Sequence, residues 1–457
     1  TNEELNAFTA EKPYLTTTTT VTAGGNEPTP VHTPAITLTA TEGVERTITV
    51  GLGDAGKVGV DWGDGIIVEQ ESAAAYDGWS NALEFTGTPA GEVKIYGEGI
   101  TYLQAFTKLE EGELKSAITA IDLGNAATIT ELDLHQNKLA TIDLTMLTAL
   151  KSLTIGVNDF TDIDLSANTE LASLDIRNGK LTAIDLSKNT KLTKVELTGN
   201  QLETLDFTSN PLVKTFQVLD NQLTSVTIGE NTAKGHTFQF GGNKLTTFDL
   251  SKASDLATSF VYLRDNDLSE VVLPADATVR RFWLDGNAFT LAQLYELKSK
   301  ATQTFTYATT YTKEYAQVPY EIAGSLSTGE TVDLSAFATL GETATVFTWK
   351  TADGTTLAEG TDYTVENGVF TFLTAQQDIH CEMTNEELNA FTAEKPYLTT
   401  TIKNVEYVSV GIDELKNADS TVVIYNLRGQ RVDTPTKGLY IVRSANGRQL
   451  GKKVAVK

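Results

Sequence analysis

The sequence predicts a mainly β fold in which short strands stack as the coils of a solenoid. An asparagine returns every 21 to 23 residues inside one apolar frame, in which Leu or Val alternates with polar residues. Alternation with period two is typical of a strand with one buried face, so residues such as Val195 and Leu197 are expected to point into the core. The asparagines are Asn137, Asn158, Asn200, Asn221, Asn243, Asn266 and Asn287, and Gly179 occupies the one register without the amide.

A second apolar pair follows in each period, and we expect it to form the opposite wall of the core. Its members are Ile142/Leu144, Ile163/Leu165, Ile184/Leu186, Leu205/Phe207, Val226/Ile228, Phe248/Leu250 and Val271/Leu273. The asparagine amide can bond to backbone groups of its turn and of the next coil, which would otherwise be buried without partners. A period in the twenties with this signature identifies a leucine-rich repeat solenoid. Such solenoids offer a wide concave sheet for binding.

Changes of pattern divide the chain into five regions. We expect an N-terminal segment or linker at 1–32, a β-sandwich at 33–92, the solenoid with a C-terminal capping helix at 93–301, an immunoglobulin-like β-sandwich at 302–403, and a small β domain at 404–457. The first coil, near 93–103, is expected to be irregular, with a helix near 109–117. Thr290 is expected to be the N-cap of the capping helix.

Composition excludes several classes of protein. The chain has 457 residues, of which 40% are hydrophobic and 21% are charged, as in water-soluble proteins of about three domains. No apolar run approaches the ~18 residues of a transmembrane span. No signal peptide opens the chain, so Thr1 is expected to be a processed or truncated start. The net charge of −25 argues against nucleic acid as a partner, because phosphates require a basic surface.

Residues 1–18 are repeated without change at residues 384–401. The second copy is expected to close the sandwich at 302–403. Because no sandwich precedes the first copy, we interpret that copy as the end of a truncated tandem domain or as an artefact. The alternative is that identical strands exchange between molecules.

Two flanking segments resemble known families. Residues 60–65, V-D-W-G-D-G, resemble a turn of PKD-like sandwich domains on bacterial surface proteins. Residues 422–432, 438–442 and 453–457 resemble C-terminal sorting domains of the type IX secretion class. The domain order looks like that of secreted leucine-rich repeat surface proteins of Gram-negative anaerobes. This resemblance implies an extracellular location on the cell surface, with anchoring through the C-terminal domain.

Residues with catalytic or metal-binding potential do not form a recognisable motif. The four histidines show no metal-ligand spacing, and no nucleophile elbow, metalloprotease helix or phosphate loop occurs. His380 and Cys381 are adjacent in a predicted strand, which sends them to opposite faces. Cys381 and Trp349 are expected in the core of the second sandwich, and the lone cysteine excludes an internal disulfide. We therefore expect no catalytic residue, no metal site and no cofactor.

Aspartates occupy the middle of the second apolar pair in successive coils. They are Asp122, Asp143, Asp164, Asp185, Asp206 and Asp249. Stacked coils lie ~4.8 Å apart, so these carboxylates are expected to form a ladder of like charges. Either hydrogen bonds in the turns and solvent absorb the repulsion, or the ladder binds cations loosely.

The outward-facing positions of the strands change in character along the solenoid, from acidic and small residues to aromatic and cationic ones. Six residues are expected to gather on two adjacent strands near the C-terminal end: Phe260, Tyr262, Arg264, Arg281, Trp283 and Asp285. Trp, Tyr and Arg are enriched at binding hot spots, and their side chains also suit sugar rings. The alternative is that this cluster packs under the capping helix or the following sandwich.

The sequence therefore predicts an extracellular binding or adhesion protein that recognises a protein or a glycan through the concave face. One alternative is a structural spacer that presents the flanking sandwiches at the cell surface. A carbohydrate-active enzyme is a more remote alternative, because no catalytic pair is recognisable.

Overall fold

The computed structural model describes residues 33–107, 117–308, 316–410, 422–426, 428, 430–433, 438–444 and 452–456. The fold is mainly β and contains a leucine-rich repeat solenoid, as the sequence predicts. The chain divides into two compact units, residues 1–192 and 193–457. The expected linker at 1–32, the first copy of the duplicated segment and the expected helix near 109–117, except for its last residue, lie outside the described residues.

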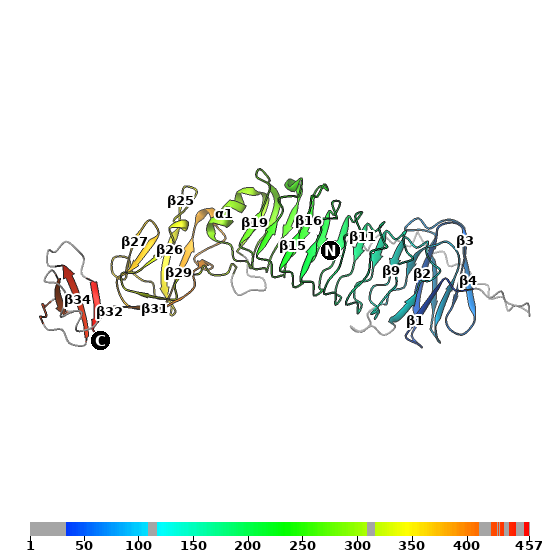
Figure 1. Cartoon of the computed structure of the whole chain (residues 1–457), viewed down its shortest axis with the longest axis horizontal. Coiled ribbons are helices and arrows are strands. Elements are labelled where there is room, and N and C mark those ends of the chain that lie inside the picture. Colours follow the sequence, from blue (N-terminus) through cyan, green and yellow to red (C-terminus); the bar gives the residue numbers. More distant parts are fainter. Residues whose placement is uncertain are drawn as a thin grey trace, which may run out of the picture. The chain divides into compact units, whose positions relative to one another are not determined.

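The first unit contains two sheets that continue into coils (Figure 1). Its strands are β1 (Ile36–Ala40), β2 (Arg46–Leu52), β3 (Gly56–Asp61), β4 (Ile67–Ser72), β5 (Leu83–Gly87), β6 (Val93–Tyr96), β7 (Ile100–Gln104), β8 (Ile118–Asp122), β9 (Glu131–Asp133), β10 (Ser152–Thr154) and β11 (Ser173–Asp175). One sheet has the order β4-β3-β6-β1-β8. In the other, β7 pairs antiparallel with β2 and parallel with β9, which begins the parallel series β9, β10 and β11.

The second unit carries further coils and then smaller sheets. The coil strands are β12 (Lys194–Glu196), β13 (Thr204–Asp206), β14 (Thr215–Gln217), β15 (Ser225–Thr227), β16 (Thr237–Gln239), β17 (Thr247–Asp249), β18 (Phe260–Tyr262), β19 (Glu270–Val272), β20 (Val279–Trp283) and β21 (Ala301–Thr306), with helix α1 (Leu291–Lys300) before the last. The strands β12, β14, β16, β18, β20 and β21 pair in parallel in that order. The opposite wall forms the short parallel pairs β13–β15 and β17–β19.

Beyond β21 the strands form separate sheets. They are β22 (Ser325–Ser327), β23 (Thr331–Asp333), β24 (Thr339–Leu340), β25 (Thr343–Ala344), β26 (Val346–Thr351), β27 (Tyr363–Glu366), β28 (Val369–Phe372), β29 (Gln376–Thr384), β30 (Tyr397–Leu398), β31 (Ile402–Glu406), β32 (Val408–Val410), β33 (Val422–Asn426), β34 (Gly438–Ser444) and β35 (Lys452–Val456). The sheet orders are β22-β31-β29-β26, β23-β28-β27 and β32-β35-β34-β33.

The asparagine column connects successive coils through its side chains. Nδ2 of Asn158 donates to the carbonyl of Ile155 in its own coil and to that of Leu134 in the preceding coil, at 2.9 and 3.0 Å. Its Oδ1 accepts from the N–H of Leu139, also in the preceding coil, at 2.9 Å. Asn243, at the equivalent position of the second unit, makes the same three kinds of bond. The ladder predicted from the asparagine period is therefore confirmed.

Strand pairing differs from the expected domain boundaries at three places. Residues 93–96 do not form an irregular coil but strand β6, which pairs with β1 and β3 in the first sheet. Residues 302–306 belong to β21, which extends the coil sheet by pairing with β20. Residues 404–406 belong to β31, which pairs with β29 and β22. In each case the strand pairs with a sheet other than that of the region to which the sequence pattern assigned it.

The capping helix begins where the sequence predicts. Thr290 is its N-cap: the hydroxyl accepts from the backbone of Gln293, whose side chain accepts in return from the backbone of Thr290. Leu291, Leu294 and Leu297 are its buried residues. This capping box satisfies backbone donors that the first turn of a helix leaves without partners.

Candidate functional site

The aromatic and cationic residues singled out in the sequence lie on two neighbouring strands of the second unit, β18 and β20. The register places Phe260 opposite Arg281 and Tyr262 opposite Trp283. The residues between them in each strand are buried, so these pairs face the outer surface of the sheet. All four side chains are half-buried.

Tyr262 and Trp283 form the centre of this surface. Their rings are stacked, with centroids 3.8 Å apart and planes inclined by 12°. Phe260 lies 6.4 Å from Trp283, measured between ring centroids. On the other side of the indole, β21 places only Thr306 opposite Trp283. Because threonine is small, that strand leaves the second face of the indole without a large neighbour, which is what a stacking ligand requires.

Arg264 and Asp285 continue the cluster beyond the ends of the strands. Nε of Arg264 donates to Oδ2 of Asp285 at 2.8 Å, and the guanidinium carbon lies 5.8 Å from the ring centroid of Tyr262. The carboxylate of Asp285 is fully buried, with a side-chain exposure of 0%. The structure therefore places Asp285, one of the six residues predicted to bind, beneath Arg264 and away from the exposed surface. Its contribution is to orient Arg264 and to balance the charge of that residue.

Arg280 belongs to the same surface, although strict alternation would place it on the opposite face from Arg281. The pairing of β20 with β21 is irregular between Val279 and Arg281, as at a β-bulge. The guanidinium carbons of Arg280 and Arg281 lie 5.1 and 5.6 Å from the ring centroid of Phe260, and both side chains donate to Oε1 of Gln303. The sequence pattern contains no signal for this bulge, so Arg280 and Gln303 were missed.

The capping helix lies against the opposite wall of the coils. Nε2 of Gln293 donates to the carbonyl of Ser269 at 2.7 Å, and Nζ of Lys300 donates to the carbonyl of Ala275 at 3.1 Å. Both carbonyls flank β19, on the wall that does not carry the aromatic surface. The alternative in which the helix buries the cluster therefore does not hold for Tyr262 and Trp283, which stay half-buried.

The side chains of the aspartate column accept hydrogen bonds within turns of the same coil. In each case Oδ1 accepts from the backbone N–H two residues later. The pairs are Asp122 with Gly124, Asp143 with Thr145, Asp164 with Ser166, Asp185 with Ser187, Asp206 with Thr208, and Asp249 with Ser251. Hydrogen bonds from Thr145 and Ser166 lower the pKa of Asp143 and of Asp164. For Asp164, the negative charges of Asp143 and Asp185 oppose this only weakly. The backbone bond from Ser187 lowers the pKa of Asp185 in the same way.

The described part of the chain contains no group of three or more His, Cys, Asp or Glu side chains that could hold a metal ion. Nor does it contain a helix long and apolar enough to cross a membrane. Cys381 pairs with Trp349 across β29 and β26, and both are fully buried. Burial raises the pKa of the Cys381 thiol, so the thiol stays protonated and unreactive near neutral pH.

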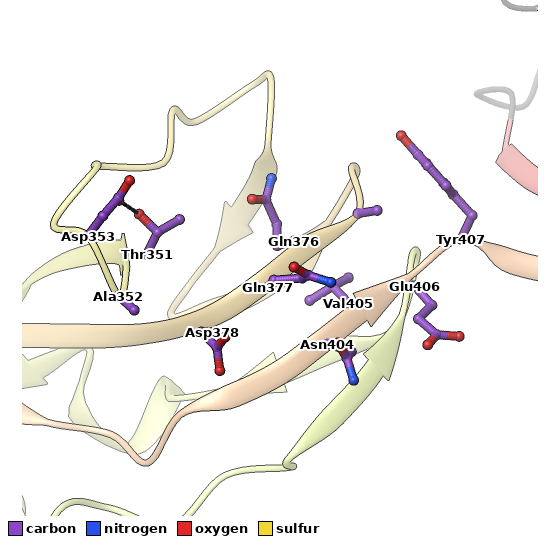
Figure 2. Close-up of a pocket in the computed structure, with 11 residues that line it drawn as sticks. Thr351, Ala352, Asp353, Gln376, Gln377, Asp378, Asn404, Val405, Glu406 and Tyr407 are labelled. Atoms are coloured by element: carbon purple, nitrogen blue, oxygen red, sulfur yellow. Dashed lines mark hydrogen bonds between the residues drawn. The ribbon is translucent and has the colours of Figure 1, made fainter.

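A groove of about 830 Å³ lies at the ends of β26, β29 and β31 in the second unit. Figure 2 shows that Gln376 and Tyr407 point to one side of the strands, whereas Asp378 and Asn404 point to the other. Asp378 accepts from Lys403, and Asp353 accepts from Thr351 and Thr355 in its own turn. The polar groups of this groove therefore diverge or already have partners, and they do not form a converging site.

Comparison with known proteins yields solved leucine-rich repeat structures of low sequence identity. The functional domain of InlJ from Listeria monocytogenes is 15% identical, with a TM-score of 0.37 over 68% of this chain and 76% of that chain. A leucine-rich repeat protein from Bacteroides eggerthii is 17% identical, with a TM-score of 0.29 over 40% of each chain. The plant peptide hormone receptor RGFR1, solved in complex with RGF2, is 18% identical, with a TM-score of 0.31.

The match to RGFR1 covers 40% of this chain. It spans only 33% of the length of the RGFR1 chain. No known family profile matches the sequence, and no curated protein matches it. The assignment of the fold therefore rests on the coils themselves, on their asparagine ladder and their parallel strand register.

Proposed function

We propose that this chain is a binding protein that recognises an extracellular protein or glycan through the outer face of β18 and β20. The observation that carries the proposal is the half-buried stack of Tyr262 and Trp283 beside Arg280 and Arg281. Aromatic and arginine side chains are the residue types that dominate binding energy at interfaces. A mainly apolar stack next to two cations suits a ligand that combines a flat apolar face with a negative group.

The charges of the cluster favour an anionic ligand. Asp285 balances Arg264, whereas Arg280 and Arg281 form no ion pair within the described part of the chain and only share Gln303 as an acceptor. Guanidinium groups bind carboxylates and phosphates through two parallel hydrogen bonds. An acidic sugar or an acidic peptide segment would supply both the flat face and the charge.

The location that we propose is the surface of a Gram-negative bacterium. Residues 60–65 resemble PKD-like turns, and β33, β34 and β35 carry the segments that resemble sorting domains. In this proposal the C-terminal β domain anchors the chain, and the solenoid presents its binding surface to the surroundings. A spacer without a ligand is the second candidate, supported by the diverging polar groups of the groove at β26, β29 and β31. A carbohydrate-active enzyme is a more remote candidate.

The test is a screen of the intact chain against glycan and extracellular-protein arrays, beside a Tyr262→Ala/Trp283→Ala variant. Trp79→Ala is the matched control, because Trp79 is 97% exposed in another part of the chain. Circular dichroism and thermal melting must show that each variant is folded. We expect the double variant to lose binding and Trp79→Ala to keep it. Binding that survives the double variant would contradict the proposed surface, and no binding at all would favour the spacer.

A further inference from the structure

We propose a second binding site in the first unit, for a cationic group such as the side chain of a lysine or an arginine on a partner peptide. The site consists of Tyr76, Tyr102 and Glu131. It is separate from the aromatic and arginine surface of the second unit, and it has the opposite charge.

The two tyrosines form a stacked pair above the sheet. Their ring centroids are 4.6 Å apart and their planes are inclined by 13°. Tyr102 lies on β7, opposite Gly51 of β2, and Tyr76 reaches this place from the loop after β4. A Cβ atom at Gly51 would lie 2.6 Å from Cγ of Tyr76. The absence of a side chain at Gly51 is therefore what lets Tyr76 pack against the sheet beside Tyr102.

The loop that carries Tyr76 is held in place by its own hydrogen bonds. The N–H of Tyr76 donates to the carbonyl of Leu52 at 2.8 Å. Oδ1 of Asp77 accepts from the N–H groups of Trp79 and Ser80 at 2.9 and 2.6 Å, and Nδ2 of Asn81 donates to the carbonyl of Ala75 at 2.9 Å. A ligand would therefore meet a ring pair that is already arranged, with little loss of entropy on binding.

Carboxylates stand beside the ring pair on the next strand. The parallel register of β7 and β9 places Glu131 next to Tyr102 and Asp133 next to Gln104. Asp133 is engaged: it accepts from Gln104 at 3.0 Å and pairs with Nδ1 of His135 at 2.5 Å. The side chain of Glu131 makes no hydrogen bond or ion pair within the described part of the chain, and it is half-buried. It is the carboxylate that remains available to a ligand.

The strand after Glu131 leaves room for a side chain. In β10, Ser152 lies beside Glu131 and Thr154 lies beside Asp133. Both are small, so a chain of methylene groups could lie across them with its charged end between the rings and Glu131. This arrangement lets a lysine or arginine keep contact along its stem as well as at its charge.

The electrostatics of the site favour a cation. The faces of aromatic rings carry negative potential, which attracts ammonium and guanidinium groups. Burial raises the pKa of both phenols, and the negative charge of Glu131 raises it further. Both tyrosines therefore stay neutral at neutral pH and lie in a negative field. The net charge of −25 on the whole chain would attract a basic partner over longer distances.

The experiment measures binding of a labelled peptide with four arginines in a glycine and serine background by fluorescence anisotropy. The same peptide with citrulline at these positions tests the need for charge. We compare the intact chain with Glu131→Gln and Tyr102→Ala. Glu42→Gln is the matched control, because Glu42 is exposed in the turn before β2, at the end of the strand far from Gly51, and loses the same charge.

We expect the arginine peptide to bind and the citrulline peptide not to bind. Glu131→Gln and Tyr102→Ala should each weaken binding about tenfold, Glu42→Gln by less than about twofold. The Tyr262→Ala/Trp283→Ala variant should bind the peptide unchanged, which separates this site from the proposed function. Equal affinities for Glu131→Gln and Glu42→Gln would overturn the proposal, because they would show only a general attraction to an acidic chain. Absence of binding to the intact chain would overturn it as well. Glu131→Gln decides the question if Tyr102→Ala fails to fold.

Discussion

At the scale of the residue, asparagines supply the polar contacts between coils. The column that includes Asn158 and Asn243 was visible in the sequence because its spacing is regular and its neighbours are apolar. A second column was missed: Asn168, Asn189, Asn210 and Asn231 are also buried, and the amide nitrogen of Asn168 donates to Leu144 and Leu147 of the preceding coil. The four are spaced by 21 residues. Their neighbours are polar, as in T-S-N-P and S-K-N-T, so these segments resemble ordinary turns and the column was not recognised.

Gly179 gives a prediction for this ladder. Gly179→Asn should supply an amide that can accept from the N–H of Phe160 in the preceding coil and donate to backbone carbonyls, as Asn158 does. The expected gain in the free energy of unfolding is about 1 kcal/mol. Thermal or urea unfolding of the intact chain measures it. A variant as stable as the wild type, or less stable, would show that this register cannot accommodate the amide.

The pair of Arg264 and Asp285 gives a second prediction. Asp285→Ala should destabilise the chain by about 3 kcal/mol, because it leaves a half-buried guanidinium without its buried counter-charge. Asp159→Ala is the control: Asp159 pairs with Lys180, and both side chains are largely exposed. Urea unfolding should show a large loss for the first variant and little change for the second. Equal small losses would mean that Arg264 finds another partner or reaches water at little cost.

At the scale of the element, local sequence signals were sufficient for the helix and the coil strands. The Thr290 cap and the spacing of Leu291, Leu294 and Leu297 predict α1 within a residue of its bounds. Strand β6 was not recognised as part of the first sheet, because its partners β1 and β3 lie far away in the sequence. The bulge at Arg280 was missed for the same reason: it depends on the pairing with β21.

The capping box can be tested directly. Thr290→Ala removes the hydroxyl that accepts from Gln293, and should lower the free energy of unfolding by about 1 kcal/mol. Ser299→Ala serves as the control at the other end of the helix, where the side chain is exposed and donates to the carbonyl of Glu296 in its own turn. If both variants melt alike, the capping box does not contribute to stability.

The aspartate turns predict how stability depends on pH. The pKa values of Asp143, Asp164 and Asp185 are lower in the folded chain than in the unfolded chain, where they are about 4. Their contribution is therefore fully present above about pH 4, and it is lost as the pH falls through the lower folded-state values. Asn at all three positions can still accept a hydrogen bond in the turn but does not titrate. Replacing all three with Asn should therefore reduce the fall in melting temperature as the pH is lowered below about 4. An unchanged fall in melting temperature at acid pH would show that these aspartates are not its cause.

The same turns argue against the alternative in which the aspartate column binds cations. Each Oδ1 atom already accepts from its own turn, and no group of ligands converges on a metal position within the described residues. We expect equal melting midpoints in calcium and in a chelator. A higher midpoint in calcium would restore cation binding by the aspartate column.

At the scale of the whole molecule, the repeat pattern predicted the fold, whereas the binding surface needed the structure. The sequence indicated that Tyr262 and Trp283 lie on adjacent strands. It could not show that their rings stack, that Asp285 is buried, or that Arg280 joins Arg281. It also gave no sign of the pair of Tyr76 and Tyr102, because Tyr76 comes from a loop and its position depends on a distant glycine.

The most direct test of the proposed surface is hydrogen exchange on the intact chain, with and without the tightest ligand from the arrays. The account predicts that the ligand slows exchange in residues 260–264 and 279–283 and leaves the strands of the first unit unchanged. Slower exchange only in the flanking sheets, with β18 and β20 unaffected, would contradict it.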